Sequence, residues 1–183
     1  MKTRQRAKEA PPSGKRAIKS WVLTLYSACL KNAGELLDEA DLLLKYGHAA
    51  RAFFLGYTAF EELAKSQVVA DYFSDQVAEA EFEAAFRDHA FKAAYISRYV
   101  QIPEAPNEEW FIEYDKATAK VYPTERARAL YVERKPDDSP QVPRDEVPRP
   151  DAERIVAAAR KYLDDIVQME YLTERIGTNS FTK

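Results

Sequence analysis

The sequence is poor in glycine, cysteine and histidine. Its 183 residues include five Gly, one Cys and two His. With so little Gly, and with abundant Ala, Leu, Glu and Lys, the composition favours helices over a turn-rich β fold. The lone Cys29 excludes an internal disulfide, which fits a reducing cytoplasm. One Cys and two His also make a thiol protease or a multi-histidine metal site hard to assemble.

Several other signals are missing from the chain. No apolar run approaches the ~20 residues needed to cross a bilayer, and the N-terminus lacks the apolar segment of a secretory signal. There is no Gly-rich phosphate loop, no GKS or GKT, and no Glu-x-x-His pair of the kind that builds di-iron bundles. We therefore expect a soluble, cytoplasmic protein with no membrane contact, no metal and no cofactor.

Charge is unevenly distributed along the chain. Residues 1–20 hold seven Lys or Arg and one Glu, net +6, which leaves 20 basic and 29 acidic residues, net −9, in the rest. Residues 1–16 show no apolar period, so we predict a disordered basic arm. Such an arm either contacts RNA or another acidic surface, or only solubilises the protein. The acidic body excludes a general coating of nucleic acid, so any RNA contact would be local.

Apolar residues recur every three or four positions in two long segments that lie one after the other. The first predicts a helix over residues 18–46 that Gly47 ends. Its stripe is Tyr26, Leu30, Ala33, Leu37, Ala40 and Leu44. The second predicts a helix over residues 48–73, with Gly56 and Ala59 allowing close approach by a neighbouring helix. Its stripe is Phe53, Tyr57, Phe60, Ala64 and Val68. The short turn predicts antiparallel packing.

The remaining segments predict shorter elements and one more long helix. We expect Ser74 or Asp75 to cap a helix through Phe86, and Asp88 to cap another from His89 to about Tyr99. Residues 108–121 are expected to be partly helical. "LYVER" is expected to be extended, and we see no other strand pattern. Residues 135–150 contain five prolines and predict a surface loop that could be pinned to the body in places.

The last long helix is expected to begin at a capping Asp151 and to end at Gly177. Its stripe is Ile155, Ala158, Ala159, Tyr162, Ile166, Met169 and Leu172. The prediction is therefore an all-α antiparallel bundle of four to five main helices with a proline-rich loop. Residues 17–177 form one domain, between the arm at 1–16 and a tail at 178–183.

The second helix carries charge in its middle. Glu61 and Lys65 stand four positions apart with the acid first, the favourable order for a helical ion pair. They are either a solvent-facing pair or, because they border the apolar stripe, partly buried charges that orient another group. Glu62 lies beside them. We predict that this turn faces His89 across the bundle interior.

His89 and Lys92 lie three positions apart on one predicted helix. Imidazole titrates near neutrality, as a general acid or base must, although a lone His is more often structural. We assign His48, beside Gly47, to the turn. Tyr131 has arginines nearby, including Arg128, and such a set either stacks on a base and holds phosphates or is a packed aromatic with solvated neighbours.

The three segments "KNAGELLDEADLLLKYGHAARAFFLGYTAFEELAKSQVV", "RDHAFK" and "RARALYVER" follow one another in the chain. In this order they resemble the AbiV-type abortive-infection family of the HEPN superfamily, from about Lys31 to Lys135. The most specific parts are Asn32-Ala33, "FEELAK", the His-x-x-Lys of "DHAFK", and the Tyr-Val pair followed by an acid in "LYVE".

The resemblance implies a HEPN-like helical bundle that forms a homodimer and acts in bacterial defence against phage. It also implies a set of site residues. The catalytic candidates are Glu62, Lys65, His89 and Lys92, and the binding candidates are Glu61, Arg128 and Tyr131.

Two functions are compatible with this set. Many HEPN proteins are metal-independent ribonucleases with an Arg-x(4–6)-His motif, which this chain lacks because Arg87 precedes His89 by only two positions. We therefore favour binding of a phage or host factor, protein or RNA, in the translation or RNA machinery. The alternative is a metal-independent endoribonuclease. In such a nuclease His89 would transfer the proton, and Glu61 or Glu62 would orient the His89 side chain. Lys65, Lys92 and Arg128 would hold the phosphate.

Overall fold

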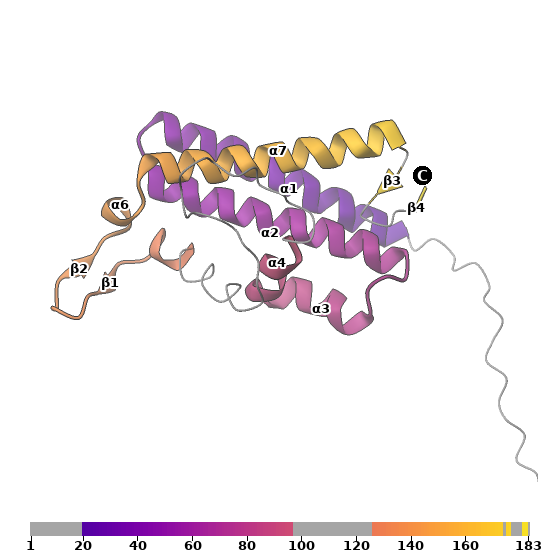
Figure 1. Cartoon of the computed structure of the whole chain (residues 1–183), viewed down its shortest axis with the longest axis horizontal. Helices are drawn as coiled ribbons and strands as arrows, with labels where there is room; N and C mark the ends of the chain where they lie inside the picture. Colours follow the sequence, from indigo (N-terminus) through magenta and orange to yellow (C-terminus); the bar gives the residue numbers. More distant parts are fainter. Residues whose placement is uncertain (1–19, 97–125, 174, 177–180, 183) are drawn as a thin grey trace, which may run out of the picture.

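The computed structural model describes residues 20–96, 126–173, 175–176 and 181–182. The predicted arm at 1–16, the partly helical segment at 108–121, Gly177 and most of the C-terminal tail lie outside these ranges. Three long helices dominate what is described, namely α1 (Ser20–Lys45), α2 (Ala49–Phe73) and α7 (Arg149–Thr173). Helix α2 packs against both others, and α1 runs antiparallel to it (Figure 1). The predicted all-α antiparallel bundle is confirmed.

A single glycine turn joins α1 to α2. Gly47 has φ of 81°, a left-handed value that favours glycine. The His48 N–H donates to Leu43 O at 2.8 Å and the Gly47 N–H donates to Leu44 O at 3.1 Å. These two bonds form a Schellman motif, which satisfies carbonyls at the end of the helix. The predicted stop at Gly47 is confirmed, and the short turn places α1 and α2 side by side.

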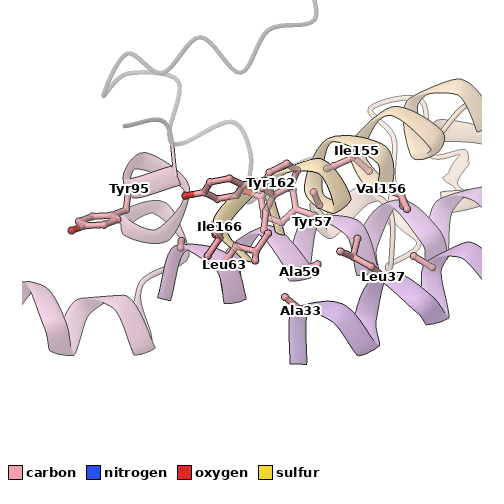
Figure 2. Packing of buried hydrophobic residues seen from close by; sticks show 14 of the residues in the cluster. Ala33, Leu37, Tyr57, Ala59, Leu63, Tyr95, Ile155, Val156, Tyr162 and Ile166 are labelled. Atoms are coloured by element: carbon pink, nitrogen blue, oxygen red, sulfur yellow. The ribbon is translucent and has the colours of Figure 1, made fainter. Parts of the chain in front are cut away.

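The predicted stripes form the core. The α1 and α2 stripe residues are buried except Leu30, which is half-buried, and Ile155, Ala159, Tyr162 and Ile166 of α7 are buried with them (Figure 2). Helix α2 is covered on nearly every side, because 17 of its 25 residues are buried. A helix in the centre of a bundle has little solvent-facing surface for charged residues. An ionised group in the buried part of α2 therefore needs a partner.

Close packing of α2 on α7 centres on Gly56. A Cβ atom at this position would lie 3.0 Å from Val156 Cγ2, 3.1 Å from Ile155 Cγ2 and 3.3 Å from the Val156 backbone N. Only hydrogen fits in that space. The expected close approach by a neighbouring helix is confirmed, and α7 is that neighbour.

Two short helices, α3 (Glu79–Arg87) and α4 (His89–Ile96), pack against α2. The predicted capping of the first by Ser74 or Asp75 is wrong. Ser74 follows the last residue of α2, where its N–H donates to Ala70 O, and Asp75 has a left-handed φ of 58°. The cap of α4 is as predicted, because Asp88 Oδ1 accepts the N–H groups of Ala90 at 2.8 Å and of Phe91 at 3.2 Å. These bonds fix the first turn of α4.

The proline-rich segment 135–150 contains more structure than the predicted loop. A helical turn at residues 126–128 and strand β1 (Glu133–Arg134) precede it, and β2 (Pro140–Gln141), inside it, pairs antiparallel with β1. The predicted extended piece "LYVER" is confirmed only at its last two residues, which form β1. The expectation of no other strand is wrong, because β2 pairs with β1. A second small pair, β3 (Arg175–Ile176) and β4 (Phe181–Thr182), also went unpredicted. Strands of two residues are too short for a period-2 pattern to show.

Helix α6 (Pro143–Glu146) pins this segment to the body through buried Pro143, as the prediction allowed. The limits of α7 also differ from the prediction. Asp151 lies in its first turn and does not cap it, because the helix already begins at Arg149. Pro150 is tolerated in this first turn, because the N–H group that proline lacks would have no helical acceptor there. The helix ends at Thr173, before the predicted Gly177. None of the helices in the described ranges has the length and apolarity that crossing a bilayer requires.

Candidate functional site

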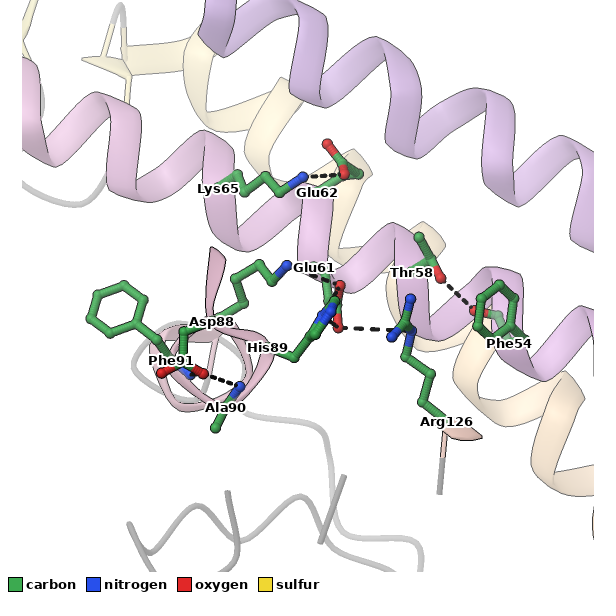
Figure 3. Close-up of polar contacts among 11 residues, drawn as sticks. Phe54, Thr58, Glu61, Glu62, Lys65, Asp88, His89, Ala90, Phe91 and Arg126 are labelled. Atoms are coloured by element: carbon green, nitrogen blue, oxygen red, sulfur yellow. Dashed lines mark hydrogen bonds and ion pairs between the residues drawn. The ribbon is translucent and has the colours of Figure 1, made fainter. Parts of the chain in front are cut away.

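The carboxylate of Glu61 is the centre of a charged cluster on buried helix α2. Its Oε1 and Oε2 lie 2.8 and 2.9 Å from His89 Nδ1, and Oε2 lies 3.2 Å from Lys92 Nζ. Oε1 also lies 3.9 Å from Nε of Arg126, so three basic side chains converge on one acid (Figure 3). We call these four residues the Glu61 cluster. Since a carboxylate between cations is an acceptor only, the Nδ1–H of His89 donates.

Helix α4 delivers two members of the cluster. The Asp88 cap orients its first turn, and residues three apart then share a helix face, so His89 and Lys92 both reach Glu61. One turn further on, the Tyr95 hydroxyl donates to Asp71 Oδ2 at 2.6 Å, and both side chains are buried. Glu61 and Asp71 are ten residues apart on α2, and their side chains point about 80° from one another around the helix. Helix α4 contacts both acids, His89 at Glu61 and Tyr95 at Asp71.

Exposure changes across the cluster. The side chains of Glu61 and Lys92 are each 4% exposed, that of Arg126 is 24% exposed and that of His89 is 44% exposed. The acid and one cation are therefore sealed, while the imidazole opens to solvent. The Arg126 guanidinium also stacks over the Phe54 ring at 4.8 Å, which holds it at the border.

The charge of the cluster is unbalanced. One carboxylate faces an ammonium and a guanidinium, so the cluster carries a net charge of at least +1 before His89 is counted. A buried carboxylate without partners would be costly, and Lys92 meets that need. Arg126 adds charge beyond it, and its Nε is buried without a hydrogen-bond partner among the described residues. The arrangement attracts an anion to the side where His89 is exposed.

Glu62 and Lys65 form a separate pair. Lys65 Nζ lies 2.5 Å from Glu62 Oε1, and Figure 3 shows the pair apart from the His89 contacts. Successive helix residues point about 100° apart, and the Glu62 side chain turns away from His89 and pairs with Lys65. The structure therefore brings Glu61, His89 and Lys92 together and leaves Glu62 and Lys65 elsewhere.

The other candidates lie on the segment that follows Arg126. Arg128 is half-buried, and the side chain of Tyr131 is exposed. The arginine of this segment that reaches Glu61 is Arg126, which was not among the predicted site residues. Asp71 and Tyr95 were also missed, although Tyr95 lies three residues after Lys92 and therefore on the same face of α4. Among the described residues, no three His, Cys, Asp or Glu side chains gather in a way that could hold a metal.

Cys29 of α1 lies near the Glu62–Lys65 pair. Burial raises the pKa of its thiol to about 12, the Glu62 carboxylate adds to the rise and the Lys65 ammonium opposes it. At pH 8 we expect iodoacetamide to alkylate the native protein roughly a thousandfold more slowly than the urea-unfolded chain, because the thiolate is the reactive form. Mass spectrometry at successive times measures both rates. Similar rates would contradict the burial of this thiol.

The same thiol gives a pH dependence of stability. In the unfolded chain it ionises near 9.0, and in the fold only near 12, so the fold holds the proton more tightly. This contribution is complete below pH 9 and is lost as the pH rises from 9 towards 12. The wild type minus Cys29→Ala difference in free energy of unfolding should therefore be flat below pH 9 and fall above it.

Comparison with known families adds one finding. The HEPN_AbiV family model, described as AbiV, matches residues 22–164. No curated protein and no solved structure matches the chain significantly. The matched range covers most of the chain and includes all four residues of the Glu61 cluster.

Proposed function

The chain belongs to the AbiV family of HEPN domains, and from this premise we propose how it acts. The family indicates an anti-phage function of the abortive-infection type. We propose that the protein works by binding a phage or host factor of the RNA or translation machinery, and that the Glu61 cluster is its RNA-binding site.

The observation that carries this proposal is the exposure of His89 beside positive charge that no second acid balances among the described residues. Glu61 neutralises only one of its cationic neighbours, and both Arg126 and His89 are partly exposed. A phosphodiester supplies the missing anion and accepts hydrogen bonds from both side chains. Because the protein as a whole is acidic, RNA would bind locally at this cluster and not over the general surface.

A second candidate function, RNA cleavage without a metal, is favoured by the orientation of the imidazole. Glu61 occupies Nδ1 and leaves Nε2 as the nitrogen able to exchange a proton with a substrate. In this reaction the 2′-hydroxyl oxygen of RNA would attack the adjacent phosphorus and pass its proton to Nε2. The bond to the 5′-oxygen would break, and this oxygen would take a proton from a water molecule. The products would be a 2′,3′-cyclic phosphate and a 5′-hydroxyl end, and Nε2 would return its proton to solvent.

The test combines binding and cleavage of labelled single-stranded RNA in the presence of EDTA. Arg126→Gln should weaken RNA binding and reduce the slope of log affinity against log salt by about 0.7, the contribution of one phosphate contact to a single strand. If the protein cleaves, His89→Ala should slow cleavage by about 100-fold or more. His48→Ala, which changes the chain's other histidine, is the matched control and should leave both readouts unchanged.

The outcomes separate the two candidates. Binding without cleavage, weakened in Arg126→Gln, supports the binding function. Cleavage that depends on His89 supports the nuclease. Absence of both, or equal loss in the His48→Ala control, contradicts the assignment of the Glu61 cluster. HEPN domains often dimerise, and we also propose a cytoplasmic homodimer, for which light scattering on the same preparation would give twice the mass of 20.9 kDa.

A further inference from the structure

A pocket lies at the end of the bundle where α1 turns into α2, and the functions proposed above do not use it. It encloses about 520 Å³, within the ~300–1,000 Å³ range of ligand clefts. Its apolar walls come from three parts of the chain. They include Leu43 of α1, Leu130 and Val132 of the segment after Arg126, and Pro143 of α6.

The walls are held in place by features already described. The Schellman turn at Gly47 fixes the ends of α1 and α2, and buried Pro143 pins α6 to the body. Figure 1 shows the β1–β2 hairpin and α6 at the same end of the molecule as the α1–α2 turn. Two of the three walls of the pocket are therefore anchored to the bundle.

The rim of the pocket is basic. His48, Arg51 and Arg144 line it, and none of its described lining residues is Asp or Glu. Arg51 is exposed on α2. Among the described residues, the ion pair of Arg144 is an exposed contact of 3.4 Å with its neighbour Asp145, which contributes little. A basic rim on a body that is otherwise net acidic selects an acidic partner.

Exposed apolar and aromatic residues stand next to the pocket. Val132 is 65% exposed, and Tyr46 and Tyr131 are exposed beside the lining residues Gly47 and Leu130. Tyr and Arg around an aliphatic cavity are typical of surfaces that bind other proteins. The described lining contains no Phe, Tyr or Trp, so the rings on which nucleobases stack most strongly are absent inside the pocket. These features favour a peptide over RNA.

We propose that this pocket binds a segment of another protein in which an apolar side chain is flanked by Asp or Glu. The apolar side chain fills the cavity between Leu43, Leu130 and Val132. The flanking carboxylates pair with Arg51 and Arg144 on the rim. The pocket shares no lining residue with the Glu61 cluster. Arg51 and Glu61 are about 15 Å apart along α2, and Arg126 lies between them over the Phe54 ring.

The test is selection of a displayed random peptide library on the full chain. We expect enriched peptides to combine Leu, Ile or Phe with Asp or Glu. A synthetic copy of one, followed by fluorescence anisotropy, should bind Arg51→Glu and Val132→Asp at least about tenfold more weakly than the wild type. Both substitutions are at exposed positions, so the fold should persist. Lys161→Glu, an exposed charge reversal on α7, is the matched control and should bind as the wild type does.

Several results would overturn the proposal. They are no enrichment, enrichment of basic peptides, or equal affinity in the wild type, Arg51→Glu and Val132→Asp. Displacement of the peptide by single-stranded RNA from the wild type and His89→Ala alike would make RNA the occupant. Loss of peptide binding when the chain self-associates would mean that the pocket is occupied by a second copy of the chain. His89→Ala should bind the peptide normally, so failure here and failure of the RNA assay are distinguishable.

Discussion

Replacing Glu61 by Ala is expected to lower the free energy of unfolding by about 3–5 kcal/mol. The substitution removes the only acid that the structure places beside Lys92 among the described residues, and the Lys92 side chain is 4% exposed. An ammonium left in that position has neither water nor a counter-charge. The loss therefore exceeds what the Glu61–Lys92 contact itself contributes, because the stranded charge adds its own desolvation cost.

Urea unfolding followed by circular dichroism measures this effect, and two further variants define its cause. Glu83→Ala breaks an exposed pair with Arg87 and should change stability by less than about 1 kcal/mol. The double variant Glu61→Leu/Lys92→Met removes both buried charges at similar volume and should recover much of the loss. If the double variant were as unstable as Glu61→Ala, the damage would come from packing and not from a stranded charge.

This stability effect bears on function. Lys92 is the structural partner of Glu61, whereas His89 uses the same carboxylate but remains exposed. Substitution of His89 removes no buried charge, so it should weaken RNA binding much more than it lowers the free energy of unfolding. Glu61→Ala should lower both RNA affinity and stability. A loss of activity in a Glu61 variant can be interpreted only together with its unfolding curve. At His89, by contrast, an effect on RNA binding can be measured without a large change in stability.

The long helices were predictable because their signal is local. The stripe from Tyr26 to Leu44 repeats at the helical period, and Gly47 supplies the only left-handed glycine at a described position. The helix boundaries that were predicted wrongly depend on which element takes a given backbone group, and a local sequence pattern does not contain that information. Ser74 suits an N-cap, but its backbone N–H is taken by the end of α2. Strand β2 depends on pairing with β1 across a tight turn.

The site was predictable only in part, for a geometric reason. Spacing placed His89 and Lys92 on one face, and Glu61 at the border of the buried stripe. Whether Glu61 or its neighbour Glu62 faces α4 depends on the rotation of α2 about its axis, which only packing decides. Arg126 reaches the cluster from 65 positions further along the chain, so no local pattern could assign it.

Replacing Gly56 by Leu is expected to lower the free energy of unfolding by about 3 kcal/mol, the upper part of the range for overpacked cores. Its Cβ alone would lie 3.0 Å from Val156 Cγ2 and 3.3 Å from the Val156 backbone. Val156 and Ile155 are β-branched and stiff, so neither side chain can turn aside cheaply. Helix α7 would have to move off α2, and the packing along the α2–α7 interface would open.

Gly34 provides the matched control for this effect, because it is a second helical glycine with room beside it. A Cβ there would meet only Leu163 Cδ2, at an ordinary contact distance of 3.7 Å. Gly34→Ala should therefore stabilise the protein by up to about 1 kcal/mol, the gain in helix propensity. Gly56→Ala has the same propensity gain but should destabilise, because the contact with α7 outweighs it. Thermal unfolding of the two Ala variants side by side measures the difference. Equal stabilisation would mean that α7 does not approach α2 at Gly56, and that the bundle holding the Glu61 face towards α4 is packed differently.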